Sequence, residues 1–399
     1  MSVQKRILVI NSLYSPHIGG GAEIISKIQV EGLQAHGFHV AVLATGPDQG
    51  LHEEVIDNVK VYRAGLKNLY WHFNDRKPGK LIRLGWHLND RYNSGMRKHV
   101  REVIERERPD VVICHNLAGW SISAWDEISS KNIPIIQVLH DLYLACSNFT
   151  MFKNGHACEK QCATCKVLRS KHSIASNKVT AVVGVSNFIL NKLTGMGYFA
   201  KSAKYAIHNA REIPDTGLKE PVTGKQPLKF GYIGTLAAVK GVEWLIEEFQ
   251  ALDIDATLTI AGKGKDDYEA HLKSIAHSDK IKFIGYANSK DFYTSIDVSV
   301  IPSLWPDTFP GVAFEASAYH VPAIATKIGG LPEIIKDGEN GILCDPTDRT
   351  SLKEAIMLMY NNAQLRNKLA HNARKTVENL LSVDRMINDY KKVIESTLT

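Results

Sequence analysis

Short apolar runs alternate along the chain with longer stretches in which apolar residues recur at helical spacing. The apolar runs are rich in β-branched residues, which is typical of strands buried on both faces of a parallel sheet. Ten runs are predicted as strands: residues 6–12, 38–45, 109–116, 133–140, 179–186, 228–234, 256–262, 281–286, 298–303 and 323–327. Because helical or loop segments follow them, the pattern predicts an α/β protein with doubly wound parallel sheets.

This pattern occurs in two halves, and a polar, turn-rich segment separates them. A length of 399 residues also fits two domains, each large enough to bury its own core. We therefore predict an N-terminal domain over residues 1–208, a linker over 209–227 and a C-terminal domain over 228–380. A final helix is expected within residues 381–399.

The composition is that of an ordinary globular protein, with 44% hydrophobic and 23% charged residues. No run of about 18 apolar residues is present, so no segment is predicted to span a bilayer. The apolar run at the N-terminus is short and lacks a small-residue cleavage site, so it is predicted as a first strand and not a signal peptide. We expect a cytoplasmic protein.

Basic residues outnumber acidic ones between Lys60 and Arg108, and aromatic residues are interleaved with them. These aromatic residues are Tyr62, Tyr70, Trp71, Phe73, Trp86 and Tyr92. The composition suits an anionic membrane surface, and it equally suits helix packing beneath a solvated basic face. No motif for binding RNA or DNA accompanies the charge, so a nucleic-acid partner is not expected.

The segment 300–335 carries the most specific chemistry of the chain. It is predicted to fold as strand, loop, helix, strand, loop and helix, and seven residues separate Asp307 from Glu315. A helix start offers free N–H groups and a positive dipole to a phosphate, while carboxylates accept hydrogen bonds from sugar hydroxyls. The combination indicates a nucleotide-diphosphate sugar as ligand. The simpler interpretation is that both acids decorate a surface helix.

Further candidate residues follow predicted strands, at the end of a parallel sheet where ligands bind. Gly20 and Gly21 precede the first helix and allow close approach of the backbone to a ligand. No GxGxxG motif is present, which argues against a nicotinamide dinucleotide site. The other candidates at strand ends are Gly234, Thr235, Lys240, Gly262, Gly285, Tyr286, His115, Asn116, His140 and Asp141.

The paired acids and the Gly-Gly loop that follows them resemble the retaining glycosyltransferases of family 4. That family has the GT-B fold, with two facing Rossmann-like domains and a cleft between them. The usual first acid of the pair is Glu, where this chain has Asp307, and Thr235 stands where Arg is common. The resemblance also implies that the last helix, 381–399, crosses back to the N-terminal domain.

The resemblance implies roles for individual residues. Glu315 would bind ribose hydroxyls, Asp307 the donor sugar and Lys240 the diphosphate, while His140 would contact a sugar or the acceptor. Backbone groups of Gly20 and Gly21 would approach the diphosphate. The other positions assigned to the donor are Gly234, Thr235, Gly262, Gly285, Tyr286, Phe309, Pro310 and Gly311.

By the same resemblance, the expected activity is transfer of a hexose from the donor to an acceptor hydroxyl, with retention and without a catalytic metal. The acceptor is expected to be a sugar or a lipid-linked saccharide of surface polysaccharide or glycolipid assembly. One alternative is a nucleotide-sugar epimerase of the same fold. Another is a non-catalytic relative that acts as a binding module, which the absence of Arg at Thr235 favours.

Four of the six cysteines lie close together within a predicted insertion at residues 142–172. Eleven, three and two residues separate Cys146, Cys158, Cys162 and Cys165. Because disulfides are rare in the cytoplasm, four thiolates suggest a structural zinc site. Free thiols and a redox-sensitive disulfide are the alternatives.

Overall fold

The computed structural model describes residues 4–73, 78–153, 155–220 and 227–398 and divides the chain into two compact units. Unit 1 comprises Met1–Met151, Cys158–Arg211 and Ser382–Thr399; unit 2 comprises Phe152–Ala157 and Glu212–Leu381. Part of the predicted linker, residues 221–226, lies outside the described residues. Each unit is built around its own sheet.

Within its described residues, unit 1 contains an eight-stranded sheet in the order β10-β9-β6-β5-β1-β2-β4-β3, and only the β3–β4 pair is antiparallel. The strands are β1 Arg6–Ile10, β2 His39–Gly46, β3 Leu51–Ile56, β4 Val59–Gly65, β5 Val111–Cys114, β6 Ile135–Leu139, β9 Ala181–Gly184 and β10 Ala203–Ala206. The helices are α1 Gly21–Ala35, α2 Lys80–Asp90, α3 Arg97–Glu107, α4 Ser123–Ser129, α5 Ala163–Leu168, α6 His172–Ala175, α7 Asn187–Gly195 and α15 Val383–Leu398.

Unit 2 has a parallel sheet, six-stranded over its described residues, in the order β13-β12-β11-β14-β15-β16. Its strands are β11 Leu228–Ile233, β12 Ala256–Ala261, β13 Ile281–Gly285, β14 Val298–Ile301, β15 Ala323–Thr326 and β16 Gly341–Cys344. Its helices are α8 Val242–Gln250, α9 Asp266–Ile275, α10 Ser289–Ser295, α11 Gly311–Ala318, α12 Leu331–Ile334, α13 Arg349–Asn361 and α14 Ala363–Thr376. A short hairpin, β7 Phe152–Lys153 with β8 His156–Ala157, also groups with this unit.

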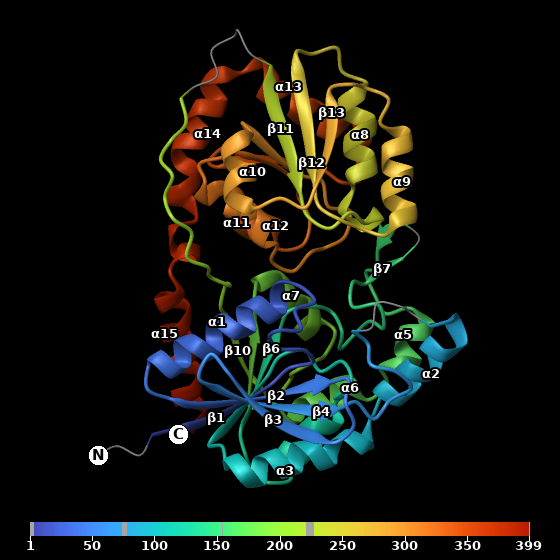
Figure 1. Ribbon diagram of the computed structural model, residues 1–399, viewed down its shortest axis with the longest axis vertical. Helices are drawn as coiled ribbons and strands as arrows, with labels where there is room; N and C mark the ends of the chain where they lie inside the picture. Colours follow the sequence, from blue (N-terminus) through green and yellow to red (C-terminus); the bar gives the residue numbers. More distant parts are fainter. Residues whose placement is uncertain (1–3, 74–77, 154, 221–226, 399) are drawn as a thin grey trace. The chain divides into compact units, whose positions relative to one another are not determined.

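All ten predicted strands are present. Short runs of β-branched residues are typical of strands that are buried on both faces of a parallel sheet. In the core of unit 2, Phe230 of β11 meets Phe249 of α8 edge to face, with ring centroids 5.8 Å apart. In unit 1, α1 and α15 come from opposite ends of the chain and lie side by side (Figure 1). Gly32 permits this contact, since a Cβ there would lie 2.5 Å from the side chain of Ile387.

The strand order places a switch point in each sheet. In unit 1 the chain builds outward from β1 in one direction and from β5 in the other, and in unit 2 the corresponding strands are β11 and β14. Loops that leave adjacent strands in opposite directions open a crevice at the carboxyl ends of those strands, where α/β proteins bind ligands. The candidate residues of both units stand at the ends of these strands or of neighbouring ones.

Candidate active site

In unit 2, Lys240 and Asp307 come from the two loops that flank the switch point. Lys240 ends a short 3-10 turn after β11, and its Nζ lies 2.5 Å from Oδ2 of Asp307, which follows β14. The same ammonium lies 5.1 Å from the centre of the Trp305 ring. Gly241 has a φ of 71°, and a Cβ there would lie 1.9 Å from the carbonyl oxygen of Pro302, so only glycine lets these two loops approach.

The loop from Asp307 to Gly311 is held by the glycine pair Gly329–Gly330. The amide of Gly330 donates to the carbonyl of Asp307 at 2.7 Å. A Cβ on Gly329 would lie 2.2 Å from that same carbonyl oxygen, so a side chain would push the loop away. The Gly-Gly element therefore fixes the approach of the loop, through Thr308, Phe309 and Pro310, to the start of α11.

Glu315 lies one turn inside α11 and is buried. Its Oε2 accepts a hydrogen bond from the Ser289 hydroxyl at 3.1 Å. A Cβ built on Gly311 would lie 3.4 Å from Oε1 of the same carboxylate, so this side chain reaches back toward the helix start, as helical side chains do. Glu315 and the loop Asp307–Gly311 thus occupy one end of the unit 2 sheet.

Glycines bring the ends of three neighbouring strands close together. Gly234 follows β11 with a φ of 153°, and a Cβ on Gly262 after β12 would lie 1.8 Å from its carbonyl oxygen. The amide of Gly262 donates to the carbonyl of Gly285 at the end of β13. The carbonyl of Thr235 accepts from the Tyr232 hydroxyl at 2.9 Å, and Tyr286 is largely exposed. Backbone groups therefore dominate this edge.

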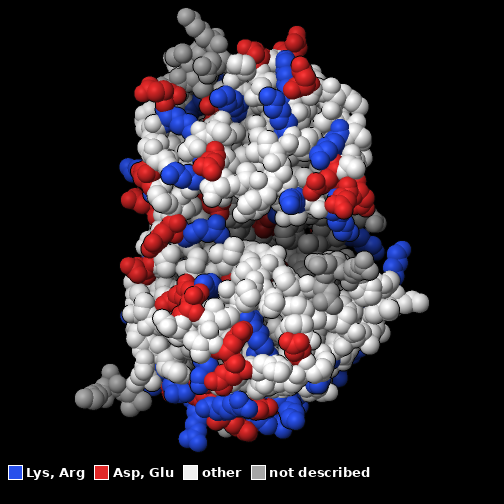
Figure 2. Space-filling view, viewed as in Figure 1, with Lys and Arg blue, Asp and Glu red and all other residues white. Residues whose placement is uncertain are grey.

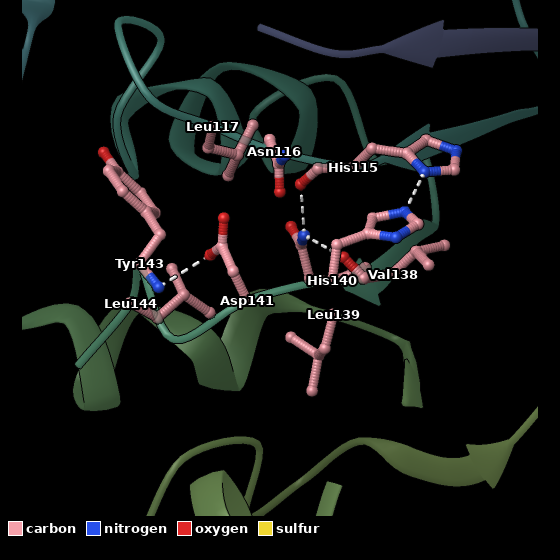
Figure 3. A pocket seen from close by; sticks show the side chains of 10 residues that line it. His115, Asn116, Leu117, Val138, Leu139, His140, Asp141, Tyr143 and Leu144 are labelled. Carbon is pink, nitrogen blue, oxygen red and sulfur yellow. Dashed lines mark hydrogen bonds between the residues drawn. The ribbon is translucent and has the colours of Figure 1, made fainter. Parts of the chain in front are cut away.

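In unit 1, a small concavity lies at the ends of β5 and β6 and is lined by His115, His140, Asp141 and Tyr143 among others (Figure 3). Nδ1 of His115 lies 2.8 Å from Nε2 of His140, and Nε2 of His115 lies 2.8 Å from Oε1 of Gln29 on α1. Burial lowers the pKa of His140 to about 4 and that of His115 well below its usual value. Both rings are therefore neutral at pH 7.

The hydrogen-bond chain assigns the tautomers of these rings. Because Oε1 of Gln29 accepts, His115 carries its proton on Nε2, and its bare Nδ1 accepts from the Nε2–H of His140. Sequence reasoning named both histidines and missed Gln29. A signal was available, since Glu23, Ser26 and Gln29 are polar at helical spacing on the buried face of α1.

Glu23 occupies the start of α1, where the sequence suggested a diphosphate. Its carboxylate accepts hydrogen bonds from the backbone N–H groups of Gly19 and Gly20 and from the side chain of Asn116, and burial raises its pKa. The proposed phosphate contact of Gly20 and Gly21 stays a prediction. A diphosphate at Gly20 would have to replace a carboxylate already bound to that amide.

A buried charge cluster, which sequence reasoning did not find, supports the wall of the unit 1 concavity. Arg169 and Asp90 are fully buried, and their closest nitrogen and oxygen lie 3.6 Å apart. The Tyr143 hydroxyl donates to Asp90 at 2.9 Å, and the Arg169 guanidinium lies 4.4 Å from the centre of the Tyr143 ring. Asp90 and Arg169 lie far apart in the sequence, and no local pattern indicates that they form a pair.

The structure departs from the zinc prediction. Among the described residues, no group of three or more His, Cys, Asp or Glu side chains is placed to hold a metal ion. The thiol of Cys165 is in hydrogen-bond contact with both Cys146 and Cys162, and backbone N–H groups also point at Cys146. These bonds lower the pKa of Cys146 to about 6. Cys146, Cys165 and Cys162 form a chain of hydrogen-bonded thiols where a shared metal centre was expected.

Comparison with known proteins identifies the family. Residues 218–376 match the family described as Glycosyl transferases group 1, and residues 19–210 match Glycosyltransferase Family 4. An uncharacterized 42.6 kDa protein in the cps region of Klebsiella pneumoniae is 27% identical over 329 residues, which are 82% of this chain and 87% of the relative.

Solved structures share the fold at low identity. Sucrose-phosphate synthase from Thermosynechococcus elongatus has a TM-score of 0.76 and 18% identity, with 98% of this chain and 99% of that chain covered. Anabaena Alr3699/HepE in complex with UDP has a TM-score of 0.72 and 16% identity, with coverages of 98% and 100%. No helix within the described residues is both long and apolar enough to cross a membrane. Because the two family matches between them extend from residue 19 to residue 376, this chain belongs to the family 4 type of glycosyltransferases with the GT-B fold.

Proposed function

We propose that this glycosyltransferase moves a hexose from a nucleotide-diphosphate sugar to an acceptor hydroxyl and retains the anomeric configuration. The observation that carries the proposal is the Lys240–Asp307 pair at the switch point of unit 2, at the same end of the sheet as the buried carboxylate of Glu315. A cation paired with one carboxylate, with a second carboxylate at the same end of the sheet, matches a ligand that has both an anionic diphosphate and neutral sugar hydroxyls.

In this proposal, each candidate site residue of unit 2 has a role. Lys240 neutralises charge on the diphosphate as the sugar leaves, while Glu315 accepts hydrogen bonds from the ribose hydroxyls. Asp307 and backbone groups of Phe309–Gly311 hold the donor sugar. The glycines after β11, β12 and β13 leave backbone groups accessible, so the nucleotide base is bound through main-chain contacts.

In unit 1, the neutral rings of His115 and His140 suit uncharged hydroxyls. His140 is held by His115 in a defined tautomer, and its ring contacts a sugar hydroxyl of the donor or the acceptor. The acceptor oxygen forms a bond to the anomeric carbon while the bond to the diphosphate oxygen breaks, and the departing phosphate receives the acceptor proton. In this proposal, catalysis comes from positioning and from stabilisation of the leaving group by Lys240, without a catalytic metal.

The substrate class follows from the resemblance and one relative. The Klebsiella pneumoniae relative is encoded in a cps region, as its name states. We therefore propose that the acceptor is a saccharide in the assembly of a surface polysaccharide or glycolipid.

Thermal unfolding in the presence of UDP-, GDP- and ADP-sugars tests the donor assignment. One donor class should raise the midpoint of the wild type, and Glu315→Ala should abolish the increase. Glu354→Ala, at an exposed glutamate of α13, is the matched control and should keep it. If a donor raised the unfolding midpoint of Glu315→Ala as much as that of the wild type, Glu315 would not be part of the donor site. If no donor of the panel raised the midpoint of the wild type, the donor proposal would be overturned. Turnover of the donor without an acceptor would favour an epimerase.

A further inference from the structure

Helix α2 exposes a stripe of large aliphatic side chains. The side chain of Leu81 is 84% exposed, and those of Ile82, Leu84 and Leu88 are 50%, 45% and 49% exposed. Leu81, Leu84 and Leu88 follow each other at spacings of three and four residues, so they share one face of the helix. Scattered exposed aliphatic side chains need no explanation, whereas three leucines and one isoleucine on one short helix indicate a surface that binds something apolar.

The opposite face of α2 is firmly attached to unit 1, so the leucines cannot be buried by a rotation of the helix. Trp86 is buried, and its indole N–H donates to the carbonyl of Tyr70 at 3.0 Å. At the end of the helix, Asp90 accepts from the amide of Gly119 at 2.7 Å and belongs to the buried cluster with Arg169. The aliphatic stripe therefore faces outward because of how the helix is anchored.

The charges around the stripe are basic. Lys80 and Arg83 are exposed on α2, and the one acidic residue of this helix, Asp90, is buried. Leu88 lines a groove together with Lys171, which is exposed at the start of α6. Asp126 also lines this groove, but its carboxylate is bound to the Tyr92 hydroxyl and to the ammonium of Lys178.

The apolar area extends beyond α2. Leu69 is 62% exposed, and a Cβ built on Gly85 would lie 2.9 Å from its Cδ1, so Leu69 lies directly against the helix. Ile174 on α6 is 72% exposed and lies one turn after Lys171. Figure 2 shows few Lys, Arg, Asp or Glu side chains over the area of α2 and α5.

We propose that this surface, defined by Leu69, α2 and the start of α6, docks unit 1 onto an anionic lipid bilayer. The aliphatic side chains would enter the boundary between headgroups and acyl chains, and Lys80, Arg83 and Lys171 would bind lipid phosphates. A helix of 11 residues is too short to span a membrane and lies in the interface plane. Protein interfaces depend mainly on Trp, Tyr and Arg, whereas leucine dominates here, which favours lipid over a protein partner.

The structure also corrects the sequence-based version of this idea. The aromatic residues of this region suited either a membrane interface or helix packing, and Tyr62 and Trp86 are buried, as packing requires. Trp71 and Phe73 pack together, with ring centroids 5.4 Å apart, and Trp71 donates to the Thr45 hydroxyl. The surface that reaches outward is aliphatic and basic. Residues 74–77, which belong to the same stretch of sequence, lie outside the described residues.

Co-sedimentation with vesicles tests the proposal. The full chain should bind vesicles that contain about 30% phosphatidylglycerol in phosphatidylcholine, and it should bind pure phosphatidylcholine much more weakly. Leu81→Ser/Leu84→Ser should reduce binding at least tenfold, and Lys80→Glu/Arg83→Glu should reduce it similarly. Val55→Ser/Leu358→Ser removes two exposed aliphatic side chains elsewhere and should leave binding unchanged.

Three outcomes would overturn the proposal: no binding of the wild type, equal binding to neutral vesicles, or full binding by the Leu81→Ser/Leu84→Ser variant. A concentration-dependent dimer that Leu81→Ser/Leu84→Ser abolishes would assign the surface to a second copy of the chain and also overturn it. Donor-dependent thermal stabilisation should be equal in all variants. Failure of vesicle binding is therefore distinguishable from failure of the proposed transferase function.

Discussion

The candidate site residues of the two units differ in how burial affects their charges. In unit 1, burial keeps His115 and His140 neutral and raises the pKa of Glu23 and Asp141. In unit 2, Lys240 and Asp307 form an ion pair whose side chains are 26% and 13% exposed. A charge that keeps some contact with water costs less to maintain than a fully buried one.

This difference suggests a division of labour. The two neutral histidines of the unit 1 concavity suit hydroxyl groups, which both donate and accept hydrogen bonds. The charged pair of unit 2 suits a diphosphate, whose charge increases as the sugar departs. Unit 1 also has a charged pair, Asp90 with Arg169, but this pair is fully buried and supports the fold. The comparison therefore separates a fully buried ion pair from a partly exposed one, for which we propose a function.

The largest expected effect comes from the buried pair. Arg169→Met leaves Asp90 buried without its cation and should lower the free energy of unfolding by about 3–5 kcal/mol. Unfolding in urea, followed by tryptophan fluorescence, measures the loss. The matched control is Arg349→Met, which breaks an exposed pair with Glu247 on unit 2 and should cost less than about 1 kcal/mol. Equal losses in the two variants would contradict the distinction.

The pair in unit 2 should behave in the opposite way. Lys240→Met should change the free energy of unfolding by less than about 1 kcal/mol, since a partly exposed pair contributes little to stability. Turnover of the donor should fall about 10²–10³-fold, because a group that stabilises developing charge is lost. Steady-state kinetics measure the decrease, and Lys353→Met, at an exposed lysine of α13, is the control. A decrease of less than fivefold would show that Lys240 does not bind the diphosphate.

A smaller effect should follow from changing the chain of hydrogen bonds in unit 1. Gln29→Leu removes the acceptor that fixes the His115 tautomer, so His140 loses its defined partner. The value of kcat/KM should fall about tenfold, because the ring of His140 loses its fixed orientation while its own atoms stay in place. Gln34→Leu, which removes an exposed amide from the same helix, should have no effect. Loss of activity in both variants would indicate damage to α1 and not to the tautomer.

The sequence predicts the central strands of the two sheets well and the strands at the sheet edges poorly. The ten apolar runs became strands because both faces of these strands are buried, which the composition itself reveals. The antiparallel hairpin β3–β4 was missed, although Asp57 and Asn58 have positive φ and form its turn. Its outer strand is exposed, so it lacks the apolar run on which the prediction depends.

The candidate site shows the same limit. Local sequence motifs identify Lys240, Asp307 and Glu315, because each of these residues lies near a helix start or a strand end. Gln29 and the pair Asp90–Arg169 depend on contacts between distant segments, and no local pattern encodes them. Cys146 and Cys165 show the reverse limit, since close spacing in sequence suggested a metal centre, while the described residues contain no group of three or more side chains placed to hold a metal ion.

The smallest expected effect is the pH dependence of unit 1. Burial raises the pKa of Asp141 to about 6, above its ordinary value in an unfolded chain. A carboxyl with a raised pKa in the folded state stabilises the fold fully below its unfolded pKa and loses that contribution as the pH rises through about 6. The free energy of unfolding should therefore fall by about 1 kcal/mol between pH 5 and pH 8 on account of this group.

Asp141→Asn isolates this contribution. The amide keeps an oxygen that can accept from the backbone N–H of Tyr143, as Asp141 does at 2.7 Å, but it does not titrate. Urea unfolding of both proteins at pH 5 and pH 8 should give a smaller decrease for Asp141→Asn than for the wild type, by about 1 kcal/mol. Identical decreases would mean that Asp141 is ionised throughout this range. The effect of burial on this carboxyl, on which the contrast with unit 2 depends, would then be absent.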